Sequence, residues 1–139
     1  MNLFSISWLF VLVLFVSCGQ NNSKHIAEPN RRLANFKIYL VYTVDSLELL
    51  DSKVNQAINS KEFNSKTDTI KYINDKIYIS FLTTATGCAN YTGDIKFTQD
   101  TIKLLLINKL ETVCSEQDCY RLVYEIENKN NKKYIIAKY

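Results

Sequence analysis

The chain has 139 residues, a formal net charge of +3 and 47% hydrophobic residues. Its 17 basic and 14 acidic side chains are spread along the sequence, without the basic patch or stripe of a nucleic-acid-binding protein. Nine Tyr and seven Phe, with only three Gly and one Pro, favour strands over a loop-rich fold. We therefore expect a small domain with one hydrophobic core and no nucleic-acid partner.

The first segment is apolar and ends abruptly at a cysteine. The run from Leu3 to Val16 is interrupted only by Ser5 and Ser7. Polar residues begin directly after Cys18. About 14 apolar residues suit the hydrophobic region of an export signal and fall short of the roughly 20 needed to span a bilayer. An uncleaved N-terminal anchor and a buried helix are the alternatives for such a run.

Phe15-Val16-Ser17-Cys18 resembles the lipobox of bacterial lipoproteins, in which a small residue precedes a cysteine that becomes lipid-modified and N-terminal. The resemblance implies a signal peptide over residues 1–17 and a lipid anchor on Cys18. The Asn-, Lys- and Tyr-rich chain with Ser-Cys-Gly at this point also resembles small lipoproteins of Bacteroidota-type bacteria. That resemblance implies a membrane-anchored protein of the cell envelope. The same resemblance implies an anchor in the outer membrane or its inner leaflet. Because the stretch directly after Cys18 lacks acidic residues, we expect the domain to face the periplasm.

Residues 18–34 are expected to be the lipidated cysteine and a flexible tether. They hold the only Pro and the only His of the chain, and few apolar side chains. Lys24, Arg31 and Arg32 could attract anionic lipid head groups, at roughly 1 kcal/mol for each basic residue near a membrane. A solvated tether predicts the same residues.

The pattern changes at Asn35, where a single globular domain is expected to begin and to continue to residue 139. Apolar and polar residues alternate from Phe36 to Val44, which predicts a strand. Asp45 and Glu48 have the spacing of a capping box. Apolar residues then recur at intervals of three and four, and they predict an amphipathic helix over residues 46–60.

The rest of the chain predicts an antiparallel meander. Strands are expected over residues 69–73, 77–84, 93–98, 101–110, about 120–127 and 134–139, with turns at 74–76, 99–100 and 128–132. A loop over residues 85–91 contains Gly87 and Cys88. The expected fold class is α+β: one amphipathic helix packed on an antiparallel sheet of about six or seven strands, which could curl into a half-barrel.

Three cysteines remain when Cys18 is assigned to a lipid, and an oxidising periplasm would bridge two of them. A Cys114–Cys119 bridge would close a short loop, and a Cys88–Cys114 bridge a longer one that should stabilise more. The spacing is unlike that of zinc sites, so no metal is expected. The only histidine, His25, lies in the tether, which leaves a cysteine nucleophile without its usual base.

A second resemblance is carried by Gly87-Cys88-Ala89-Asn90-Tyr91-Thr92-Gly93, followed by Ile95, Phe97 and Cys114. This stretch of about 30 residues resembles the META-domain pattern of a Gly-Cys-Asn start, a hairpin and a later cysteine. The resemblance implies a small antiparallel lipoprotein domain. It also favours Cys88–Cys114 as the bridge over Cys114–Cys119.

Carboxylates could support acid–base catalysis, but here they lie in ordinary turns or on a charged strand face. We therefore expect no enzyme and no cofactor. Tyr and Arg are enriched at the centres of protein interfaces. The candidate residues for binding a partner protein in the envelope are Tyr91, Glu111, Glu116, Asp118 and Arg121.

The expected function is that of a lipid-anchored binding or accessory protein of the cell envelope, without catalytic activity. The alternative is a periplasmic immunity or inhibitor protein that neutralises a toxin or hydrolase. The segment from Glu111 to Asp118, with three carboxylates beside two cysteines, could form the inhibitory loop.

Overall fold

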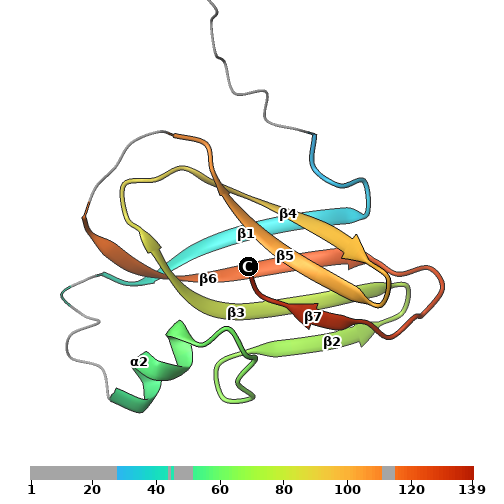
Figure 1. Cartoon of the computed structure of the whole chain (residues 1–139), viewed down its shortest axis with the longest axis horizontal. Coiled ribbons are helices and arrows are strands. Elements are labelled where there is room, and N and C mark those ends of the chain that lie inside the picture. Colours follow the sequence, from blue (N-terminus) through green and yellow to red (C-terminus); the bar gives the residue numbers. More distant parts are fainter. Residues whose placement is uncertain (1–27, 44, 46–51, 111–114) are drawn as a thin grey trace, which may run out of the picture.

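The computed structural model describes residues 28–43, 45, 52–110 and 115–139. The described part of the chain forms two sheets and helix α2 (Ser52–Asn59) (Figure 1). One sheet has the spatial order β1 (Leu33–Tyr42), β6 (Gln117–Glu127), β3 (Lys76–Thr86) and β2 (Thr69–Ile73). The other has the order β4 (Tyr91–Thr98), β5 (Thr101–Asn108) and β7 (Ile135–Ala137). This arrangement confirms the α+β class.

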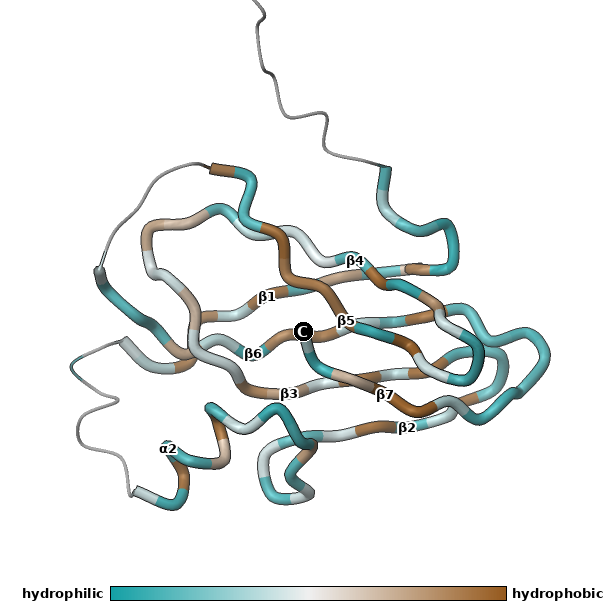
Figure 2. The backbone as a smooth tube through the Cα atoms, in the orientation of Figure 1, coloured by the Kyte–Doolittle hydropathy of each residue, from teal (hydrophilic) through white to brown (hydrophobic). Residues whose placement is uncertain are grey.

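The core lies between the two sheets. Apolar positions, coloured brown, recur along the strands of both sheets (Figure 2). Every second residue of these strands points into the core, because successive side chains of a strand point to opposite faces. The fully or almost fully buried residues are Ile77, Ile79 and Phe81 of β3, Leu122, Tyr124 and Ile126 of β6, Ile95 of β4, and Ile102 and Leu104 of β5. Burial of each such side chain contributes about 1.5–3 kcal/mol, so this layer is the main source of stability.

The sheets approach each other closely at Gly93 of β4. A Cβ atom at this position would overlap the ring of Phe36 on β1. The Phe36 ring in turn packs edge-on against Tyr124, with centroids 4.9 Å apart. Glycine is therefore required here by the space between two strands of different sheets.

Helix α2 packs on the outer face of the larger sheet. Ile58 of the helix is buried with Leu82 of β3 and Cys119 of β6. Leu82 follows the inward-facing Phe81, so its side chain lies on the opposite face of the sheet. The predicted amphipathic helix is confirmed over residues 52–59. The predicted first turn at residues 46–51, with Glu48 of the capping box, falls outside the described residues.

Two predicted turns are confirmed by backbone geometry. Asn74 joins β2 to β3 with φ of 52°, and Gln99 joins β4 to β5 with φ of 49°. Both values lie in the left-handed region, which tight hairpin turns use.

The prediction of one antiparallel sheet was wrong in two respects. The strands form two layers, because the apolar residues of β4 and β5 bury only when this hairpin lies across the inner face of β3 and β6. In addition, β7 pairs with β5 in parallel, with Thr101 opposite Ile135. The segment after β6 reaches the beginning of β5, where Ile135 N donates to Asp100 O at 2.8 Å. From that end, β7 can only run alongside β5 in the same direction.

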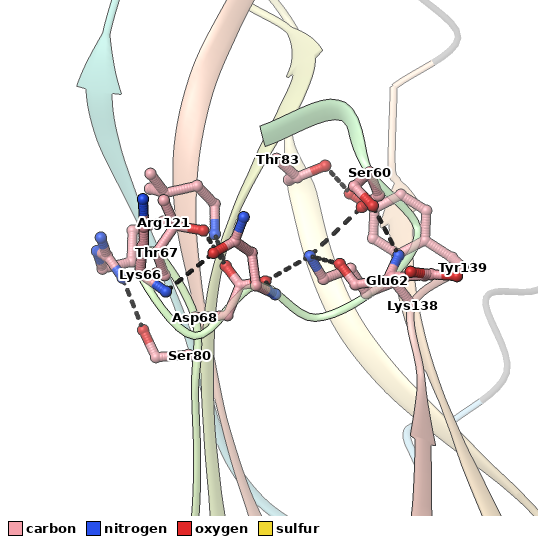
Figure 3. A network of polar contacts seen from close by, with 12 residues as sticks. Ser60, Glu62, Lys66, Thr67, Asp68, Ser80, Thr83, Arg121, Lys138 and Tyr139 are labelled. Atoms are coloured by element: carbon pink, nitrogen blue, oxygen red, sulfur yellow. Dashed lines mark hydrogen bonds and ion pairs between the residues drawn. The ribbon is translucent and has the colours of Figure 1, made fainter. Parts of the chain in front are cut away.

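A buried ion pair joins the edges of the two sheets (Figure 3). Lys138, just after β7, places Nζ 2.7 Å from Oδ2 of Asp68, just before β2, and the two side chains are 5% and 2% exposed. Nζ also donates to the carbonyl oxygens of Ser60 and Glu62 at 3.4 and 3.1 Å. It lies 5.1 Å from the centroid of the Phe81 ring, whose face attracts a cation.

The Asp68 carboxylate also accepts hydrogen bonds from the segment that leads into β2. It accepts from Asn64 N and Thr67 Oγ1, both at 2.9 Å. A longer bond of 3.4 Å comes from Leu82 N, which lies beyond the last residue of β3 that pairs with β2. The carboxylate thus accepts from a backbone N–H that has no partner on β2. Together these hydrogen bonds compensate for the desolvation of both charges.

We predict that Lys138→Met lowers the free energy of unfolding by about 3–5 kcal/mol, because it leaves a buried carboxylate without its cation. Urea denaturation followed by circular dichroism measures the loss. Lys103→Met, on an exposed position of β5, is the matched control and should change stability by about 0.5 kcal/mol or less. Equal stability of the two variants would contradict the role of the pair.

Candidate functional site

Tyrosine side chains gather at the end of the sandwich where β4 and β6 begin. We call this surface the tyrosine end and define it as Leu40, Tyr91, Tyr120 and Tyr139. Tyr91 and Tyr120 pack edge to face, with ring centroids 6.2 Å apart. Tyr139 follows β7 and packs near Phe81, with centroids 6.4 Å apart. Rings from three separate strands or segments therefore meet on one surface.

Each hydroxyl group of this surface has a protein partner that fixes its ring. Tyr91 Oη donates to Thr86 O at 3.2 Å. Tyr120 Oη donates to Gly87 O at 3.3 Å and lies 3.5 Å from Oδ2 of Asp118. Tyr139 Oη lies 2.6 Å from Thr83 Oγ1. The rings are thereby held in place before any partner arrives, which lowers the entropy cost of binding.

Leu40 extends this surface along the edge strand β1. It lies opposite Tyr120 in the register between β1 and β6. Its side chain is 56% exposed, and its neighbours Tyr39 and Val41 are 50% and 38% exposed. Because side chains alternate along a strand, Leu40 lies on the face of Tyr120, whereas Tyr39 and Val41 lie on the opposite face. An exposed apolar side chain at the end of an edge strand is suited to contact with another protein.

A small cavity opens beside Tyr139, between α2 and β3. Its volume is about 130 Å³. Its lining residues are Ile58, Asn59, Ser60, Lys61, Thr83, Thr84, Lys138 and Tyr139. This space is suited to a single side chain of a partner.

The surroundings of Tyr120 and Tyr139 favour the protonated phenol. Burial, the nearby Asp118 carboxylate and Tyr91 raise the pKa of Tyr120. Burial also raises the pKa of Tyr139, and this effect outweighs the opposing hydrogen bond with Thr83. Tyr120 and Tyr139 therefore present neutral phenol groups.

The structure brings together some of the predicted site residues and separates others. Tyr91 and Asp118 both lie at the tyrosine end, and Glu116 is exposed beside them, with its carbonyl oxygen accepting from Gly87 N at 3.0 Å. Arg121 faces the outer side of the larger sheet, where Nη1 donates to Thr67 O at 3.3 Å and Ser80 Oγ at 3.2 Å. Arg121 is therefore not part of this surface. Glu111 lies outside the described residues.

Sequence reasoning did not single out Leu40 and Tyr139. The alternation of β1 grouped Leu40 with Phe36 and Ile38, which are partly buried against the core, although Leu40 lies near the end of the strand. Tyr139 reaches Thr83, 56 positions earlier in the sequence, and only the folded chain brings them together.

The cysteines differ in their chemical state. Cys88 is disulfide-bonded, whereas Cys119 is a free and buried thiol. The alternative Cys114–Cys119 bridge was therefore wrong, because Cys119 points into the contact between the larger sheet and α2. The favoured Cys88–Cys114 bridge involves a residue outside the described residues and stays a prediction.

Burial raises the pKa of the Cys119 thiol to about 11, against the opposing charge of Arg121. At pH 8 only roughly a thousandth of such a thiol is the reactive thiolate. We predict that iodoacetamide leaves Cys119 unmodified in the native protein and labels it in urea. Peptide mapping without reduction should also recover Cys88 linked to Cys114. Rapid native labelling of Cys119, or a linked Cys114–Cys119 peptide, would contradict this assignment.

Comparisons with known proteins return no matching family model, no matching curated protein and no matching solved structure. Within the described ranges, no helix is both long and apolar enough to cross a bilayer. In that same part of the chain, no three His, Cys, Asp or Glu side chains come close enough to hold a metal ion. The lipoprotein and META-domain resemblances stay predictions from the sequence.

Proposed function

We propose that this protein is a lipid-anchored binding protein of the cell envelope, without catalytic activity, and that its tyrosine end binds another envelope protein. The observation that carries the proposal is the set of fixed tyrosine rings beside the exposed Leu40. Tyrosine offers a large apolar ring with few rotatable bonds, so its contacts contribute strongly to protein interfaces.

The position of the proposed anchor fits this role. The tether would join the domain just before Arg32, at the start of β1. β1 begins at Leu33, so seven residue steps of about 3.3 Å carry the chain roughly 23 Å to Leu40 and the tyrosine end. A lipid on Cys18 would hold one end of the sandwich near the membrane and leave the tyrosine end directed away from it.

The inhibitor function is the second candidate, and the exposed Glu116 beside the tyrosine end favours it. An acidic side chain on an aromatic surface could bind a basic substrate cleft of a hydrolase or toxin. The two candidates share one surface and differ in the partner that this surface binds.

We predict that the protein recovered from membranes lacks residues 1–17 and carries a lipid mass on Cys18. Intact-mass spectrometry of the membrane fraction measures both changes together. Cys18→Ala should abolish the lipid mass and the cleavage, because no other residue can supply the modified thiol at that site. An unmodified full-length chain in the membrane fraction would contradict the lipid anchor.

We predict that a photo-crosslinking amino acid in place of Leu40 captures a defined envelope protein, whereas the same replacement of Ile73 does not. Ile73 is a matched control because it is also an exposed apolar residue, 51% against 56%, and lies on edge strand β2. Mass spectrometry identifies the captured protein. A toxin or hydrolase as that protein would favour the inhibitor function. Equal crosslinking at both positions would contradict a partner site at the tyrosine end.

A further inference from the structure

A polar cavity lies at the opposite end of the sandwich from the tyrosine end. Its volume is about 390 Å³, and it is lined by Arg32, Glu127, Lys129, Asn130 and Tyr134. This volume falls in the range of about 300–1,000 Å³ that is usual for small-molecule sites. We propose that this cavity binds a phosphate group through the guanidinium of Arg32 and the ammonium of Lys129.

Arg32 is fixed by contacts on several sides. Its Nε and Nη2 atoms donate to Glu127 O at 3.2 and 2.9 Å, and its own carbonyl oxygen accepts from Glu127 N at 2.8 Å. The guanidinium carbon lies 3.9 Å from the centroid of the Phe97 ring. A flexible side chain is thus held in one position, so little further entropy is lost when an anion binds.

The same contacts leave donors available for a ligand. A guanidinium carries five N–H groups, and its Nε side is occupied by Glu127 O. Nη1 has a long contact of 3.5 Å with Tyr134 Oη. Within the described residues, Nη1 and Nη2 each donate to one acceptor, so one N–H group of each nitrogen is left for a ligand. Two N–H groups on neighbouring nitrogens can bind two oxygens of a phosphate or carboxylate.

The charges around the cavity favour an anion. Lys129 adds a second cation, 74% exposed, whose Nζ lies 3.4 Å from a carboxylate oxygen of Glu127. The Glu127 charge is thereby partly neutralised, and the lining keeps one net positive charge from two cations and one anion. Lys132 is also close, but it is held by Asp100 at 2.6 Å.

The size and polarity of the cavity point to a phosphate with a small polar group attached. Asn130 can bond to hydroxyl groups, and the Tyr134 ring offers a flat apolar surface. Phosphorylated glycerol has these features, whether free in solution or as the head group of phosphatidylglycerol. Either source is compatible with the position of the cavity beside Arg32, where the tether would join the domain.

The test uses the full chain in maltoside micelles. Glycerol 3-phosphate is titrated against glycerol as the uncharged control, with the side-chain amide of Asn130 followed by NMR and the heat of binding measured. In a second arm, micelles containing phosphatidylglycerol are compared with micelles containing phosphatidylcholine. Lys129→Glu reverses one charge of the site, and Lys96→Glu makes the same change at an exposed position of β4.

We expect Lys129→Glu to weaken binding about tenfold or more, which corresponds to about 1.4 kcal/mol, and Lys96→Glu to change it less than about twofold. Arg32→Lys should also weaken binding, because it keeps the charge and loses the two N–H groups on neighbouring nitrogens. Binding of glycerol 3-phosphate would assign a soluble ligand. Binding of phosphatidylglycerol micelles alone would assign a lipid head group. Equal weakening by both charge reversals, or no binding in either arm, would overturn the proposal.

Discussion

The buried pair of Lys138 and Asp68 holds together parts of the chain that the strand pairing leaves separate. β7 is an edge strand of the smaller sheet and β2 an edge strand of the larger one, and no backbone ladder connects them. The ion pair, with the carbonyl oxygens of Ser60 and Glu62, ties the C-terminal segment to the connection between α2 and β2 (Figure 3). A charge pair in the interior is stabilising only when its remaining hydrogen-bonding groups are also satisfied, and here they are.

The two ends of the sandwich differ in their chemistry. Tyrosine rings held by hydrogen bonds and the exposed Leu40 occupy one end. Arg32 and Lys129 surround a polar cavity at the other. β1 runs from one end to the other, so the distance between the two surfaces is fixed by a single rigid strand. A protein held near a membrane by its N-terminal side could contact head groups at one end and a protein partner at the other.

The sequence predicted most of the secondary structure because it depends on local patterns. Alternation along β3 and β6 identified buried strands, and the turns at Asn74 and Gln99 were also found. The functional surfaces were harder to predict. Tyr91 and Asp118 were both candidates for binding a partner, and the structure brings them to the same end of the sandwich. Arg121, a third candidate, alternates to the outer face and bonds to Thr67 O. Arg32 was expected in a flexible tether, and the structure instead fixes it against Phe97.

By itself, the sequence determined the α+β class, the strand order along the chain and the cysteine spacing, because periodicity and turn chemistry act over a few residues. The tertiary structure alone decided that the strands form two layers, that β7 lies parallel to β5, and that Cys119 is a free thiol. It also decided which polar side chains are buried together. Lys138 and Asp68 are 70 positions apart, and no local pattern specifies a contact that forms only when both sheet edges are in place.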